Sequence, residues 1–212
     1  METILAMAII LPFGLMLELW IFYSARVKGR RVPMRHCVLT ILFLCSCAAL
    51  LAILGLPSIV DFHPEHWRKE LILIPFVSMP KNPMGNLRTI FSFLPFGFLW
   101  PLVWKSTARQ TIIAGCWYSL AIEFLQLFNW RTTSINDWIL NVVGTMLGYL
   151  LLHLLQTHLK KGKVWLREPS VEVPEHGLQR YEKRICILLP WISQFIFYPI
   201  VTGGITSFSV AH

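Results

Sequence analysis

Long apolar stretches alternate with short charged segments along this chain. The apolar stretches cover residues 3–25, 37–60, 89–104, 110–130, 138–159 and 185–212. Five of these six are long enough to cross about 30 Å of hydrocarbon as helices of about 20 residues. The stretch 89–104 is shorter, so we expect its helix to begin near Met84 and the side chain of Arg88 to reach toward the lipid headgroups. The pattern predicts an all-α, polytopic bundle of about six transmembrane helices.

Composition supports the same class of protein. Of the 212 residues, 55% are hydrophobic and only 14% are charged, which is too apolar for a typical soluble domain and suits a multi-pass protein of the cell membrane. The formal net charge of +8 is consistent with attraction to anionic headgroups, so membrane lipids are the expected partners. We expect no nucleic acid partner.

The basic residues indicate how the helices are oriented. Fourteen of the nineteen Lys and Arg residues follow the first, third and fifth apolar stretches. The other five lie in the alternate loops: Arg68, Lys69, Lys81, Arg88 and Arg131. Because cytoplasmic loops are enriched in basic residues, this division predicts that both termini lie outside the cytoplasm.

These boundaries divide the chain into four parts. An N-terminal two-helix hairpin covers residues 1–60, a core of one outer loop and three helices covers 61–159, a cytoplasmic linker covers 160–184, and a C-terminal transmembrane helix covers 185–212. In the outer loop, the run LILIPFVSMP is too short to cross a bilayer and contains two prolines. We expect this run to lie at the interface or to enter the membrane as a re-entrant segment.

Five polar residues interrupt the apolar sequence of the core. They are Glu123, Gln126, Arg131, Asp137 and Asn141. An ionisable residue within a membrane segment is energetically costly, so it is a functional-site candidate by default. Helical spacing places Glu123 and Gln126 on one face, and Asp137 and Asn141 on one face of the next helix. With Arg131 in the loop that joins these helices, the sequence predicts a polar pocket that opens to the outer face.

A structural interpretation competes with that pocket. The five polar side chains can satisfy one another and lock the two helices together without binding a ligand. Such a lock is costly for two helices that a short loop already joins, which favours a functional role. Gly144 and Gly148 have a small-xxx-small spacing, and this spacing favours close packing against another helix over contact with a ligand.

The same residues form motifs that resemble the VanZ-like membrane proteins. That family has a P-x-G-x-x-x-P helix, which resembles LPFGFLWPLVW with Pro95, Gly97 and Pro101. An E-x-x-Q helix, an Arg loop and a D-x-x-x-N-x-x-G-x-x-x-G-Y helix follow in the family. The matching residues here are Glu123, Gln126, Arg131, Asp137, Asn141, Gly144, Gly148 and Tyr149. The chain departs from the family at Thr89, where Asn is usual, and at Ser134 and Asn136, where acidic residues are more usual.

The resemblance implies a protein of the bacterial cell envelope, and the family's prototype is associated with low-level resistance to the glycopeptide teicoplanin. Our first hypothesis is therefore a non-enzymatic protein whose outer pocket binds a lipid-linked cell-wall intermediate or a lipoglycopeptide and so affects teicoplanin susceptibility. The expected ligand-binding residues are Arg88, Glu123, Gln126, Arg131, Asp137 and Asn141.

The alternative hypothesis is a membrane enzyme that acts on a polyprenyl phosphate or a related lipid. In that case Arg88 or Arg131 holds the phosphate, and Glu123 or Asp137 is the candidate general base. The sequence lacks a second strong phosphate-binding motif, so we rank the enzyme lower.

Other polar residues give weaker signals. Transport of ions or protons through Glu18, Glu123 and His153 needs a continuous polar path, which the sequence does not provide. His63 and His66 lie three apart in the outer loop, but this spacing alone does not predict a metal site. Glu18 is expected to extend toward the headgroups or to pair with a basic residue at that level. We expect no metal and no cofactor.

Cysteine accessibility tests the orientation. A single reporter cysteine at Lys161 in an otherwise cysteine-free protein should not react with a membrane-impermeant thiol reagent in intact cells, because the basic linker is expected in the cytoplasm. The same cysteine should react after the membrane is permeabilised. Labelling in intact cells would show that the orientation is reversed.

Overall fold

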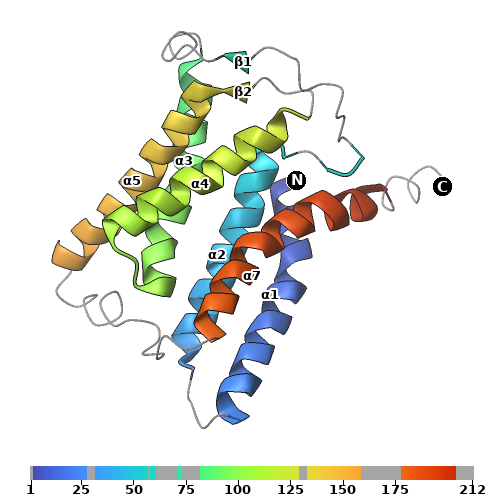
Figure 1. The fold of residues 1–212 in the computed structure, drawn as a ribbon, viewed down its shortest axis with the longest axis vertical. Coiled ribbons are helices and arrows are strands. Elements are labelled where there is room, and N and C mark those ends of the chain that lie inside the picture. The colour runs from blue at the N-terminus through green and yellow to red at the C-terminus, as the bar shows by residue number, and fades with distance from the viewer. Residues whose placement is uncertain are drawn as a thin grey trace.

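The computed structural model describes residues 2–27, 32–56, 58–60, 71–72, 82–128, 133–158 and 178–203. Within these ranges the chain forms six helices (Figure 1). They are α1 (Glu2–Val27), α2 (Met34–Leu54), α3 (Pro83–Trp104), α4 (Ala108–Gln126), α5 (Ile135–His158) and α7 (Leu178–Ile192). A π-helical turn, η3 (Ser193–Phe197), continues α7. Two short strands, β1 (Leu71–Ile72) and β2 (Thr133–Ser134), pair in parallel.

The all-α architecture is confirmed. Among the described residues, α1, α2, α3, α5 and the segment Tyr181–Gly203 are long and apolar enough to cross a membrane, which makes five such helices. The sixth helix, α4, has 19 residues and buries Ser119, Glu123 and Gln126, and these polar residues lower its hydropathy. It returns the chain from the end of α3 to the end of the bundle where α5 begins (Figure 1).

The start of α3 agrees with the sequence prediction, and the start of α7 does not. Helix α3 begins at Pro83, close to the predicted start, and Asn82 caps it by accepting a 2.9 Å hydrogen bond from the backbone N–H of Gly85. Helix α7 begins at Leu178, whereas the sequence predicted a start at residue 185. The first turns of α7 contain charged residues, so the apolar stretch in the sequence begins later than the helix does. The run LILIPFVSMP lies outside the described residues except for its first two, which form β1.

Helices α3 and α5 pack with their backbones in contact. A Cβ added at Gly148 would overlap the carbonyl group of Leu94, and one added at Gly97 would overlap the backbone of Thr145. Gly144 meets the backbone of α3 in the same way. The structure therefore supports the packing interpretation of the small-xxx-small spacing, because side chains here would push the two helices apart.

Aromatic rings fill the space between α2, α3 and α4. The cluster consists of Phe43, Phe93, Phe96, Trp100 and Tyr118, with neighbouring ring centroids 5.1 to 6.5 Å apart. Tilted and edge-on pairs at such distances add to the stabilisation from burial. This cluster and the contact between α3 and α5 fix the position of α4.

The close helix contact is testable with one methyl group. Replacing Gly148 by Ala should destabilise the protein by about 1 to 3 kcal/mol, because the new Cβ overpacks a backbone contact. Thermal melting of the purified protein in detergent measures this effect. The matched control is Gly203→Ala, where nothing lies within 4 Å of the added Cβ, and it should melt like the wild type. Unchanged melting of Gly148→Ala would contradict the contact.

Candidate functional site

Two of the predicted site residues bind the C-terminal end of α2. Gln126 Nε2 donates a 2.7 Å hydrogen bond to the carbonyl oxygen of Leu54, and Arg88 Nη2 donates one of 3.2 Å to that of Ile53. Gly55 ends the helix in the left-handed conformation with φ 65°. The last carbonyl groups of a helix lack intrahelical partners and carry partial negative charge, so both bonds stabilise this end. Arg88 and Gln126 are thereby brought to the same end of the bundle.

Glu123 binds the residues at the start of α5. Its side chain is buried, and Oε2 accepts a 3.3 Å hydrogen bond from the backbone N–H of Ser134. The Ser134 hydroxyl oxygen accepts in turn from the backbone N–H of Asn136 at 3.2 Å. Because the N-terminal end of a helix carries partial positive charge, this position suits a carboxylate. Ser134 and Asn136, which depart from the family pattern, thus both lie in the site.

Further along the same helices, α4 and α5 are joined by direct hydrogen bonds. Asn141 is fully buried, and its Nδ2 donates to the hydroxyl oxygen of Ser119 at 2.8 Å. Trp138 Nε1 donates to the backbone carbonyl of Cys116 at 3.2 Å. Asn141 is therefore part of a cross-link between the two helices, and its partner Ser119 is not one of the five residues that the lock interpretation paired with one another.

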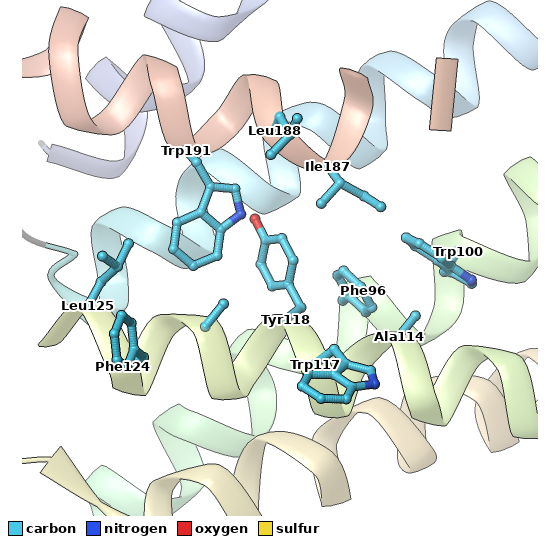
Figure 2. A pocket seen from close by; sticks show the side chains of 11 residues that line it. Phe96, Trp100, Ala114, Trp117, Tyr118, Phe124, Leu125, Ile187, Leu188 and Trp191 are labelled. Carbon is cyan, nitrogen blue, oxygen red and sulfur yellow. The ribbon is translucent and has the colours of Figure 1, made fainter. Parts of the chain in front are cut away.

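An apolar groove runs along α4 beside these polar groups. One part, of about 370 Å³, lies where α4 meets α3 and α7 (Figure 2). Figure 2 shows Tyr118 of α4 and Trp191 of α7 facing each other there, and their ring centroids are 5.2 Å apart. A second part, of about 450 Å³, is lined by Glu123 and otherwise by apolar residues. Trp117, Ala121 and Phe124 line both parts, so the groove follows α4 and its second part reaches Glu123.

The remaining predicted residues lie as follows. Asp137 is half-buried in the first turn of α5, four residues before Asn141. Arg131 lies outside the described residues, so its pairing with either carboxylate stays a prediction. His63 and His66 also lie outside the described residues.

Two features of the structure were not predicted from the sequence. The first is the groove, because one of its walls comes from α7, which lies far from α3 and α4 in the sequence. The second feature is the surroundings of Glu18, which was expected to extend toward the headgroups or to pair with a basic residue and is buried within the protein beside His36 and Glu182. The position of Glu18 within an apolar stretch marks it as unusual in the sequence, but the local sequence does not predict which residues surround it.

Comparison with known proteins gives one match. A family model described as VanZ/LLP1 matches residues 41–156, just over half of the chain. The matched segment includes all predicted site residues from Arg88 to Asn141 and leaves out α1 and α7. No curated protein and no solved structure matches the chain.

A double-mutant cycle tests the cross-link between α4 and α5. Asn141→Ala and Ser119→Ala should each lower the melting temperature, and their effects should be coupled by about 0.6 kcal/mol, the average for hydrogen bonds between membrane helices. Asn141→Ala combined with Ser46→Ala is the control. The Ser46 hydroxyl bonds within α2, so these two effects should add. Additive effects for Asn141 and Ser119 would show that the bond does not form.

Proposed function

Since this chain belongs to the VanZ/LLP1 family, we propose that it is a lipid-binding membrane protein of the bacterial cell envelope. Its ligand is a lipid-linked cell-wall intermediate, with the hydrocarbon chain in the apolar groove along α4 and the polar head at the end where α2, α3, α4 and α5 meet. By holding this intermediate, the protein alters the access of teicoplanin to its target and so affects susceptibility.

The observation that carries the proposal is the continuity of the groove with Glu123. Eleven residues line its first part, and all of them are alanine, leucine, isoleucine or aromatic residues. A hydrocarbon chain gains dispersion contacts in such a groove and exposes no polar group to it. The second part of the groove reaches the buried residue Glu123, one helical turn from Gln126, so a bound lipid has its chain and its head in different chemical surroundings.

The charged groups at this end favour a particular kind of head. Arg88 is exposed, and its bond to Ile53, the one that it makes among the described residues, uses one of the five N–H donors of a guanidinium, so the others suit a phosphate. When ionised, Glu123 and Asp137 are hydrogen-bond acceptors and not donors, which suits hydroxyl and amide N–H groups of a ligand. A polyprenyl diphosphate that carries sugar and peptide groups offers a hydrocarbon chain, phosphates, hydroxyls and amides together.

The enzyme alternative uses the same groove and differs in the fate of the lipid. Glu123 lines an apolar pocket, and a carboxylate in such surroundings is a candidate general base. Turnover of a bound polyprenyl phosphate that Glu123→Gln abolishes would favour the enzyme over the binding protein.

A binding experiment with two substitutions tests the proposal. Ala121→Trp fills the groove where its two parts join, and Glu123→Gln removes the charge at its end while keeping an acceptor for the Ser134 N–H. Each should weaken binding of a polyprenyl-diphosphate-linked saccharide peptide at least tenfold in native mass spectrometry. Teicoplanin susceptibility of cells should change in parallel, and the melting temperature should stay near that of the wild type.

The matched control is Ala8→Trp on the exposed face of α1, which adds the same side chain away from the groove. It should bind like the wild type. Unchanged binding in both Ala121→Trp and Glu123→Gln, with lowered melting temperatures, would reject the proposal and leave the polar residues a purely structural role.

A further inference from the structure

Three side chains with metal-ligating atoms meet where α1, α2 and α7 pack together. Glu18 of α1 is 4% exposed, His36 of α2 is 1% exposed, and Glu182 of α7 is 3% exposed. The carboxylate oxygens and the imidazole nitrogen all lie within 4.8 Å of one another. His36 Nε2 lies 2.7 Å from Glu182 Oε1.

The charges of this cluster are not balanced by its own members. Two ionised carboxylates carry two negative charges, and a protonated His36 offsets one of them. Both carboxylate oxygens of Glu18 are buried, and among the described residues neither has a hydrogen bond of good geometry. The Cys37 thiol and the Thr40 hydroxyl lie beside them, but the Thr40 hydroxyl donates to the carbonyl oxygen of His36. The ammonium group of the neighbouring Lys183 lies 4.5 Å from the ring centroid of Trp100 and so contacts α3. Ionisation of a carboxylate buried in this way is strongly unfavourable unless a cation accompanies it, so the arrangement suits a further cation.

We propose that Glu18, His36 and Glu182 bind one divalent transition-metal ion of the zinc type. In a tetrahedral zinc site, bonds of about 2.0 to 2.2 Å place the ligand atoms roughly 3.2 to 3.6 Å apart. The separations here, from 2.7 Å to within 4.8 Å, bracket that range, so small side-chain rotations complete the site. Two carboxylates and a neutral imidazole neutralise a divalent ion. The imidazole favours a transition metal over Mg²⁺ or Ca²⁺, which prefer oxygen ligands.

This metal site is separate from the proposed lipid site and does not depend on it. His36 lies near the start of α2, whereas Arg88 and Gln126 bind its other end, about 27 Å away at 1.5 Å per residue. All three ligands lie outside residues 41–156, the segment that the family model matches. The metal joins α7 to the N-terminal helix pair. Since Ile187, Leu188 and Trp191 of α7 line the groove, the metal also holds that wall in place.

Metal binding to the full-length protein tests the inference. The protein, purified in detergent without a histidine tag and stripped with a chelator, should bind one equivalent of Zn²⁺ in isothermal titration calorimetry. Zn²⁺ should raise the melting temperature by several degrees, while Mg²⁺ and Ca²⁺ at the same concentration should not. Glu18→Gln, His36→Gln and Glu182→Gln should each weaken Zn²⁺ binding at least tenfold, a loss expected when a ligand is removed.

The matched controls are Glu2→Gln and His153→Gln, which change exposed residues of the same types and should bind like the wild type. His36→Cys keeps a zinc ligand and should retain binding, which separates loss of a ligand from loss of the fold. Absence of stoichiometric Zn²⁺ binding by the wild type would overturn the proposal. So would binding that persists in the Glu18→Gln/Glu182→Gln double variant and is lost in His63→Ala/His66→Ala, since it would place the metal in the outer loop.

Discussion

The close approach of α3 and α5 is the contact on which the other features of this protein depend. In a membrane, helices gain little from burying apolar side chains, because lipid is as apolar as they are. Gly97, Gly144 and Gly148 allow the two backbones to touch, so dispersion contacts accumulate along the length of both helices. Gly115 of α4 then packs against the side chain of Thr145 on α5. The position of Glu123 relative to the start of α5 follows from this three-helix packing.

The polar residues of the core have divided roles. Asn141 cross-links α4 and α5, and Gln126 binds the end of α2, so both stabilise the arrangement of the helices. Glu123 is in a different position, because one of its oxygens binds the start of α5 while the side chain also lines the groove. Structural and functional interpretations of the motif are therefore compatible. The hydrogen bonds of Asn141 and Gln126 hold the helices in the arrangement that places Glu123 beside the groove.

The sequence predicted the features that depend on local pattern. Apolar length identified the helices, the shortness of the stretch 89–104 gave a start of α3 near Met84, and the spacing of Gly144 and Gly148 predicted close packing. The start of α7 was missed because its first turns are charged. These turns pack in the bundle where Glu182 pairs with His36. His36 and Glu182 are 146 residues apart, and no local periodicity connects such a pair. The groove was missed for the same reason, since only the folded chain brings α7 beside α4.

The short parallel pairing of β1 and β2 gives the site a mechanical connection to the loop before α3. Ile72 pairs with Ser134 in the register, and the backbone N–H of Ser134 is the group that binds Glu123. Ser134 therefore takes part in two contacts at once, the pairing with the strand that precedes α3 in the chain and the hydrogen bond to the Glu123 carboxylate. The residue that receives the Glu123 carboxylate is thus also the one that ties the start of α5 to β1.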